Sequence, residues 1–331
     1  MTFSHHRVSK AKGIGRRVRP VFASMVFWLL AALPALAQAN VMMENTLFLA
    51  GTGNPAVDQR VSDLLEKALS GTDATDNRPE LTVLPFREDQ ARKAPSVPVV
   101  ALGPEAVTRV LQESPESPIL ALLVNEGFYS ALNAPSERIS ALFYDPPLAR
   151  QALLGKTILP HATRIAVLAR PENALRYDNQ LAPLRDAGLE AQVFVVSSDD
   201  RLIPTLVRAL GYGDFLLALP DDRIYNPRTI KHILLTAYRR SRIVIGPRQA
   251  YVKAGALAST YTPLTTLVRE AAGYIRTHRE KGAFPPAAYP LGYAIEVNRQ
   301  VARSLNILLG DDQALEQQLQ DNIRQLQEVA P

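Results

Sequence analysis

The sequence predicts an α/β fold of two lobes, each built on a parallel sheet with helices on both faces. Short apolar runs that suit buried strands alternate along the chain with amphipathic helical patterns, which is typical of parallel sheets. About ten strands are predicted, too many for one compact sheet in a chain of this length but suitable for two. The chain is expected to divide near residues 145–148, where Asp145-Pro146-Pro147 closes a strand.

The first lobe is expected to begin with a strand and a helix. Pro55 suits the first helical position, because proline lacks the N–H that would have no partner there. The residues that follow it repeat apolar side chains on one face of a helix, which Gly71 stops. A polar loop is expected at 72–79. The predicted strands of this lobe are 47–50, 81–84, 97–102, 119–124 and 139–144.

The second lobe repeats the same alternation. Asn226 followed by Pro227 is typical of a helix start, with a capping side chain first and a proline in the first turn. The predicted strands are 164–169, 192–196, 215–219, 243–245, 255–260 and 293–297. The tail at 313–329 carries an apolar stripe, which either packs on its own lobe or contacts a partner. The stripe consists of Leu315, Leu319, Ile323 and Leu326.

The first 37 residues are typical of a secretory signal peptide. Six basic residues and no acid precede the 13-residue apolar run 21–33, and Ala35-Leu36-Ala37 resembles a cleavage site. The apolar run is shorter than the roughly 20 residues of a membrane-spanning helix. We therefore expect export to the periplasm with cleavage before Gln38; an uncleaved anchor is the alternative.

Charge and composition exclude several classes of protein. The chain has 37 basic and 32 acidic residues, and six of the basic ones lie in the leader, which leaves 31 against 32. This balance and the lack of a basic tract with aromatic residues argue against a nucleic-acid partner. The absence of cysteine excludes disulfides, thiolate metal sites, cysteine nucleophiles and a lipid-modified N-terminal cysteine.

Motifs of enzymes are missing from the sequence. It contains no G-x-S-x-G elbow, no P-loop and no G-x-G-x-x-G after a strand. His161, His232 and His278 are isolated and have no partner at metal-ligand spacing. Asp221-Asp222 could supply two carboxylates for acid–base chemistry, but adjacent loop residues usually point apart. No catalytic residue, metal or cofactor is expected.

Polar, loop-forming residues follow several of the predicted strands. If the sheets are parallel, all of these residues lie at carboxyl edges, where ligands of open α/β sheets bind. Two lobes that face each other would gather them around one small ligand; a solvated surface loop is the alternative for each one. The candidate ligand-binding residues are Thr52, Gly103, Glu126, Tyr144, Asp145, Asn173, Asp221 and Arg223.

From residue 139 onward the chain resembles the substrate-binding proteins of ABC transporters with the type I periplasmic-binding fold, in the branch that includes amino-acid-binding members. The matching stretches include Y-D-P at 144–146, R-I-A-V-L-A-R-P-E-N at 164–173, L-L-A-L-P-D-D at 216–222 and, most specifically, V-K-A-G-A-L-A-S-T-Y at 252–261. The resemblance is good over about 140–308 and weak over 41–138.

The resemblance implies two Rossmann-like lobes joined by three crossovers, with a hinged cleft for the ligand. The N-terminal lobe would comprise 41–145 plus about 255–283, and the C-terminal lobe 146–254 plus about 284–331. Tyr144, Asp145, Asn173 and Asp221 would contact the ligand, with Asp221 pairing an ammonium group. Backbone donors near Thr52 or Gly103 would bind a carboxylate.

We therefore expect a monomeric periplasmic protein that captures a small molecule, such as an amino acid or related carboxylate, for an ABC permease in the inner membrane. The alternative is a ligand-sensing or regulatory partner of a membrane receptor or kinase without a role in transport. An enzyme that uses Asp221 is a third and weaker hypothesis.

Overall fold

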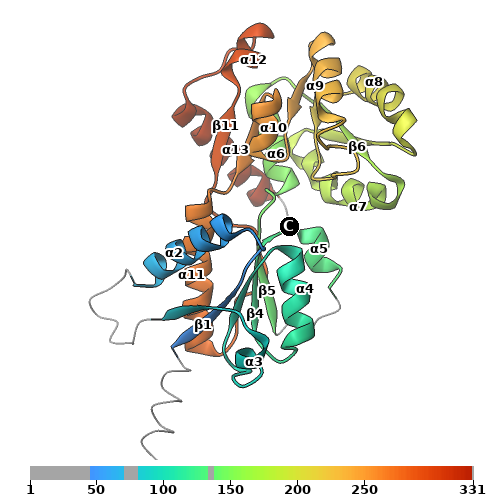
Figure 1. Ribbon diagram of the computed structural model, residues 1–331. Helices are drawn as coiled ribbons and strands as arrows, with labels where there is room; N and C mark the ends of the chain where they lie inside the picture. The colour runs from blue at the N-terminus through green and yellow to red at the C-terminus, as the bar shows by residue number, and fades with distance from the viewer. Residues whose placement is uncertain (1–44, 71–80, 133–137, 330–331) are drawn as a thin grey trace, which may run out of the picture. The chain divides into compact units, whose positions relative to one another are not determined.

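The computed structural model describes residues 45–70, 81–132 and 138–329 of the 331-residue chain. These residues form two lobes, each built on its own β-sheet (Figure 1). The predicted signal peptide at 1–37 and the predicted polar loop at 72–79 lie outside the described residues.

The sheet of the first lobe has five parallel strands in the order β2-β1-β3-β4-β5. Each strand coincides with a predicted apolar run to within about two residues, the usual uncertainty of an element boundary. β3 and β5 are buried along their whole length, as a sheet covered on both faces requires. The strands are β1 (Thr46–Ala50), β2 (Thr82–Pro85), β3 (Val99–Leu102), β4 (Ile119–Val124) and β5 (Ile139–Phe143).

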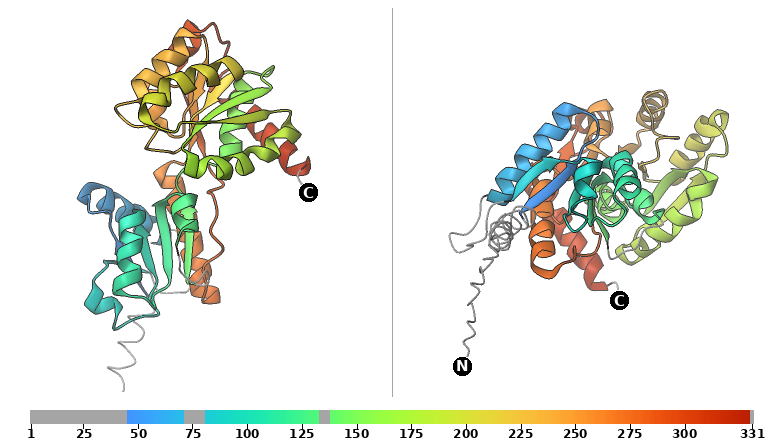
Figure 2. Two further views of the ribbon diagram at one scale, coloured as in Figure 1. Left: turned by 90° about the vertical axis from the view of Figure 1, so that its right-hand side faces the viewer. Right: turned by 60° about the horizontal axis from the view of Figure 1, so that its bottom comes forward.

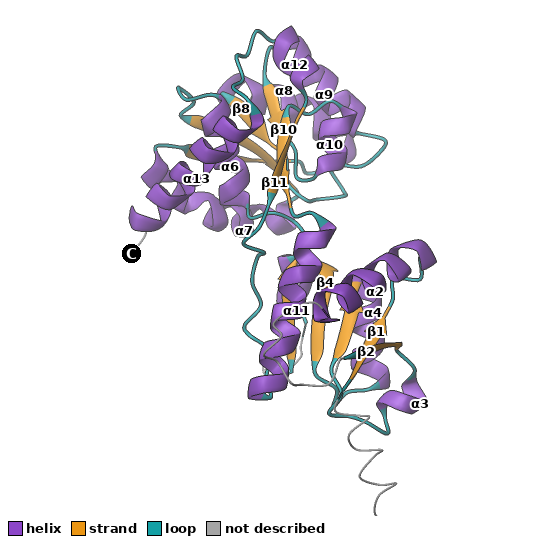
Figure 3. Ribbon diagram, turned by 90° about the vertical axis from the view of Figure 1, so that its left-hand side faces the viewer, coloured by secondary structure: helices purple, strands orange, loops and turns teal. Residues whose placement is uncertain are grey.

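Helices cover both faces of this first sheet. On one face α2 (Pro55–Ser70) and α11 (Leu264–Lys281) pack side by side over the strands (Figure 3). On the other face α4 (Gly103–Glu113) packs its buried apolar side chains against the sheet. Two short helices, α3 (Glu88–Ala91) and α5 (Glu126–Ser130), complete the lobe.

The second sheet has six strands in the order β11-β10-β9-β8-β6-β7. All of its pairs are parallel except β10 with β11. β11 is antiparallel because the chain leaves β10 for the first lobe and returns beside it, so that Tyr261 pairs with Ala294. The strands are β6 (Arg164–Ala169), β7 (Glu190–Val195), β8 (Phe215–Leu217), β9 (Ile243–Ile245), β10 (Ala258–Tyr261) and β11 (Ala294–Val297).

One hydrophobic core unites this sheet with its helices, and it includes the C-terminal helix. Leu315 and Leu319 of α13 are buried in that core, and Ile323 and Leu326 pack against it. Figure 2 shows α13 beside α6, where Asn322 donates to the hydroxyl of Thr157 at 2.9 Å. The apolar stripe of the tail therefore packs on its own lobe. The helices are α6 (Leu148–Ile158), α7 (Pro171–Leu181), α8 (Leu202–Tyr212), α9 (Ile230–Arg239), α10 (Gln249–Ala254), α12 (Arg299–Ser304) and α13 (Asp312–Val329).

The chain passes between the two lobes three times, after β5, after β10 and after α11. The predicted boundaries need correction at the last two passages. The segment 255–283 divides, because Ala258 of β10 pairs with Ile245 in the second sheet, whereas α11 packs on the first. The beginning of the 284–331 segment belongs with the first lobe, because Ala288 exchanges backbone hydrogen bonds with Ala141 and Phe143 of β5.

None of the helices in the described ranges combines the length and the apolar character needed to span a bilayer.

Candidate functional site

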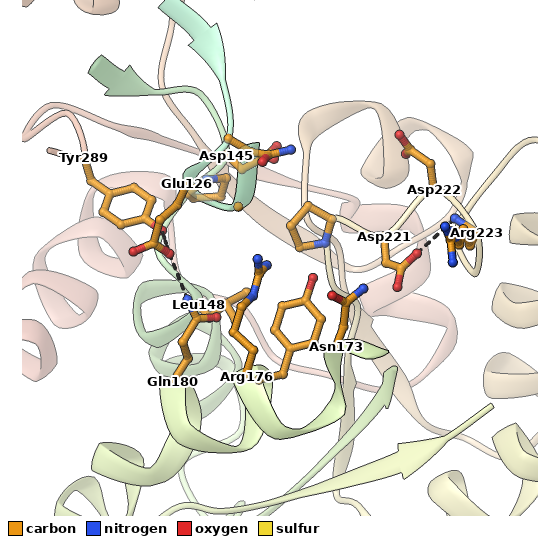
Figure 4. A pocket seen from close by; sticks show the side chains of 15 residues that line it. Glu126, Asp145, Leu148, Asn173, Arg176, Gln180, Asp221, Asp222, Arg223 and Tyr289 are labelled. Carbon is orange, nitrogen blue, oxygen red and sulfur yellow. Dashed lines mark hydrogen bonds between the residues drawn. The ribbon is translucent and has the colours of Figure 1, made fainter. Parts of the chain in front are cut away.

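A pocket of about 310 Å³ lies where segments of both lobes meet (Figure 4). It is formed by the residues after β4, β5, β6 and β8, together with one side chain of the connector before β11. These are carboxyl ends of parallel strands, the edge at which the sequence predicted a ligand site. The lining residues are Asn125, Glu126, Gly127, Asp145, Pro146, Leu148, Asn173, Arg176, Tyr177, Gln180, Pro220, Asp221, Asp222, Arg223 and Tyr289.

The structure brings five of the eight predicted site residues into the lining of this pocket. They come from four segments that are far apart in the sequence, each at or just after the carboxyl end of a strand. The five residues are Glu126, Asp145, Asn173, Asp221 and Arg223.

The other three predicted residues do not line the pocket, and each has a local role. Thr52 donates its N–H and its hydroxyl to Oδ1 of Asp58, at 2.7 and 2.8 Å, in the first turn of α2. Gly103 begins α4 with φ of 83°, a left-handed conformation that glycine adopts without strain. Tyr144 donates its N–H to the carbonyl of Val124, and its side chain is exposed.

Asp221 has a buried carboxylate oxygen without a hydrogen-bond partner among the described residues. It lies directly after Pro220, where β8 has ended, and only 6% of its surface is exposed. Its Oδ1 accepts the backbone N–H of Arg223 at 3.0 Å, but its Oδ2 is buried and has no partner among the described residues. A buried acceptor without a partner costs about 1–3 kcal/mol, and more if it is charged. Asp221 therefore presents an acceptor that a ligand can satisfy.

Asp145 is equally buried, but its carboxylate is already paired. Nε of Arg248 lies 2.6 Å from Oδ1 of Asp145 and Nη2 lies 3.4 Å from Oδ2. Burial opposes the charge of Arg248, yet the hydrogen bond and the charge of Asp145 outweigh that effect, so the pKa of Arg248 is raised. Asp145 lines the pocket as one half of an ion pair.

Arg176 contributes a cation that the sequence did not reveal. Its guanidinium stacks on the ring of Tyr177 at 4.9 Å and forms no ion pair with any described residue. Gly127 makes room for it, because a Cβ at that position would lie 2.5 Å from Nη1 of Arg176. Figure 4 shows the side chain of Arg176 rising from α7 into the pocket. Arg176 is thus available to an anionic group of a ligand.

Glu126 connects three segments of the chain. Its Oε2 accepts hydrogen bonds from the amide of Gln180 at 2.8 Å and from the hydroxyl of Tyr289 at 3.0 Å. Burial, followed by the neighbouring charge of Glu126, raises the pKa of Tyr289, so the phenol stays a donor. The ring of Tyr289 packs edge-on against the ring of Phe143, with 5.0 Å between the ring centroids, and this contact holds the hydroxyl in place.

Arg223 lines the pocket, but its side chain is largely exposed and its guanidinium pairs with Glu172. The backbone of Arg223, through its N–H, contributes more to the site than its charge does.

The pocket residues that the sequence analysis missed lie mostly on one helix. Arg176, Tyr177 and Gln180 follow Asn173 at offsets of three, four and seven, so they share one face of α7. That spacing was readable in the sequence and is the signal that could have identified them. Tyr289 had no such signal, because it reaches the pocket from a connector of the chain.

The pocket offers ion pairing and hydrogen bonding rather than a nucleophile with a base. None of the described residues that line it is His, Ser or Thr, and the chain has no Cys. Among the described residues no group of three or more His, Asp or Glu side chains is placed to hold a metal ion.

No protein-family model and no curated protein matches this sequence. Several solved structures do match. The chain is similar to CD0873 of Clostridium difficile, a substrate-binding protein with adhesive properties, in its ligand-free open form. The identity is 15% and the TM-score 0.62, over 81% of this chain and 96% of that one.

Two further structures show the same likeness. For the ABC domain in complex with L-Trp from Streptococcus pneumonia, the identity is 14% and the TM-score 0.52, over 82% of this chain and 98% of that one. For a conserved domain protein of Vibrio cholerae, the identity is 18% and the TM-score 0.53, over 82% of this chain and 97% of that one. At such identities the likeness concerns the fold. The predicted fold class, two parallel-sheet lobes of the periplasmic-binding type, is confirmed.

Proposed function

We propose that this chain is a periplasmic solute-binding protein that captures an amino acid or a related small carboxylate and delivers it to an ABC importer. Its fold is one whose members bind small molecules between two lobes, and CD0873 is itself a substrate-binding protein. Binding energy would select a closed arrangement of the lobes, and no chemical step is required.

The observation that carries this proposal is the unpartnered Oδ2 of Asp221 in the pocket. An ammonium group would satisfy that oxygen with a charge-assisted hydrogen bond. The unpaired guanidinium of Arg176, in the same pocket, would bind a carboxylate. Together the two groups suit a ligand that carries both charges, as an amino acid does.

Isothermal titration of the purified protein against a panel of amino acids and small carboxylates tests the proposal. We expect one member of the panel to bind, and Asp221→Asn to lose that binding while Asp178→Asn keeps it. Asp178 is a matched control because it is exposed on α7 outside the pocket lining. The proposal would be overturned if no member of the panel bound in titration or changed the melting temperature in thermal-shift measurements.

Delivery to an importer needs a separate test. The apolar stripe of the tail, for which a partner contact was the alternative to packing on its own lobe, is packed within the second lobe. We expect the protein to co-purify with an ABC permease and to support uptake of its ligand in cells. Co-purification with a receptor or kinase instead would favour the sensory function.

A further inference from the structure

In two carboxylates of the pocket, only one of the two oxygens accepts a hydrogen bond. Asp221 uses Oδ1 for the N–H of Arg223, and its Oδ2 has no partner among the described residues. Glu126 receives both of its hydrogen bonds, from Gln180 and Tyr289, on Oε2. Its Oε1 accepts no hydrogen bond from any described residue. Two lining residues, one from each lobe, therefore have a carboxylate oxygen without a partner among the described residues.

The remaining charges of the pocket are paired within the protein or exposed to solvent. Asp145 is paired with Arg248, and Asp222 is exposed, so that solvent screens its charge. Figure 4 shows the carboxylate of Asp222 directed away from that of Asp221. Arg223 is paired with Glu172. Apart from the exposed Asp222, the carboxylates of Glu126 and Asp221 are left against the guanidinium of Arg176, which forms no ion pair with a described residue, so these three groups carry one net negative charge.

A ligand of one positive charge complements this arrangement. Charges that are withdrawn from water are favourable only if each meets a partner of opposite sign. A neutral amino acid would satisfy Arg176 and one carboxylate and leave the other carboxylate uncompensated. A dicarboxylate would increase the excess of negative charge. A ligand with two ammonium groups and one carboxylate satisfies all three groups.

We propose that the ligand is a diamino monocarboxylic acid, with one ammonium on Oδ2 of Asp221, the second on Oε1 of Glu126, and its carboxylate on Arg176. This inference rests on the proposed solute-binding function and narrows its ligand class.

The remaining lining supports this class over aromatic solutes. Both tyrosines of the pocket are already engaged, Tyr177 beneath the guanidinium of Arg176 and Tyr289 through its hydroxyl on Glu126. The apolar part of the lining is limited to Pro146, Leu148 and Pro220. A volume of about 310 Å³ is at the lower end of small-molecule pockets, which suits a compact solute.

Three probes that differ by one charged group test the proposal by isothermal titration. L-Lysine has all three charged groups, L-norleucine lacks the second ammonium, and 1,5-diaminopentane lacks the carboxylate. We expect lysine, or its shorter homologue ornithine, to bind about 100-fold more tightly than norleucine, because truncating one member of a desolvated charge pair has effects of that size. The diamine should bind at least tenfold more weakly than the diamino acid, because Arg176 then has no partner.

Two substitutions test the proposed positions of the second ammonium and of the carboxylate. Glu126→Gln should remove the preference for lysine over norleucine, because the amide oxygen can still accept from Gln180 and Tyr289 but the amide NH2 cannot accept from the second ammonium. Arg176→Gln should remove the preference for lysine over 1,5-diaminopentane. Glu116→Gln and Arg185→Gln are matched controls, since both residues are exposed outside the pocket lining. Circular dichroism checks that each variant is folded.

The outcomes separate this inference from the function on which it rests. Tighter binding of norleucine or tryptophan than of lysine would overturn the diamino class and leave solute binding intact. Equal affinity of Glu126→Gln and the unmodified protein for lysine would also overturn it. If no amino acid or carboxylate of any class binds, the proposed solute-binding function itself fails.

Discussion

Arg248 and Asp145 form an ion pair across 103 residues of sequence, with Nε of the arginine 2.6 Å from Oδ1 of the aspartate. Asp145 belongs to the segment between β5 and α6, and Arg248 precedes α10 after β9. The pair therefore ties the crossover segment after β5 to the second lobe, at one wall of the pocket.

Removal of the arginine should destabilise the protein. Arg248→Gln leaves the buried carboxylate of Asp145 without its cation, and we expect the free energy of unfolding to fall by about 1–3 kcal/mol. Urea denaturation measures this change. The double variant Asp145→Asn/Arg248→Gln should be less affected than Arg248→Gln alone, because it buries no unpaired charge. Equal losses in both variants would contradict the pairing.

Gly127 should control the position of Arg176. In Gly127→Ala the new Cβ meets Nη1 of Arg176 at 2.5 Å, so the flexible arginine has to move while the fold persists. We expect affinity for a carboxylate ligand to fall by about tenfold or more, the effect of one charged hydrogen bond, in titration. Gly211→Ala is the control, because open space surrounds that position in α8. An unchanged affinity in Gly127→Ala would show that Arg176 does not bind the carboxylate.

Gln151 is a buried polar residue whose role is structural. Its amide donates to the carbonyl of Gly246 at 2.7 Å and accepts the N–H of Thr260 at 2.8 Å, so it joins α6 to β9 and β10. Gln151→Leu would leave both backbone groups without partners, and each buried group of this kind costs about 1–3 kcal/mol. Urea denaturation should therefore show a clear loss of stability. The exposed Gln112→Leu should show little change.

His278 should make stability depend on pH. Burial lowers the pKa of its imidazole, which packs against Phe284 at 4.4 Å. The unfolded chain, with an ordinary histidine pKa of about 6.5, binds the proton more readily, so protonation favours unfolding. The stability that neutral His278 contributes is complete above about pH 6.5, the ordinary histidine pKa, and is lost as the pH falls through the lowered pKa of the folded state.

We expect the difference in unfolding free energy between the protein and His278→Gln to shrink between pH 8 and pH values well below 6.5, when both are measured in urea. His161→Gln is the control, because that residue is exposed. A difference that stays constant with pH would contradict the half-buried, neutral state of His278.

Much of the fold was readable from local patterns. The apolar run at 243–245 is a buried strand because only a core accepts three consecutive large aliphatic side chains, and Pro55 begins α2 where its missing N–H has no cost. The lobe boundaries near β10 were harder to predict from the sequence. Ala258–Tyr261 could have joined either sheet by composition, and its pairing with β9 and β11 decided which.

Part of the candidate site was also predictable. Asp145, Asn173 and Asp221 follow strands directly, and parallel strands place such residues at one edge. The sequence did not distinguish the paired carboxylate of Asp145 from the incompletely bonded one of Asp221, because Arg248 lies far away along the chain.

The alternation of strands and helices, and with it the edge at which the polar loops gather, could be read from side-chain periodicity and parallel topology. Which charges of that edge are neutralised depends on contacts in three dimensions. Asp145 meets Arg248, Glu126 meets Gln180 and Tyr289, and Arg176 finds no carboxylate among the described residues. These outcomes depend on contacts between segments far apart in sequence, since charge pairing acts over a few ångströms of space and carries no signature in local sequence.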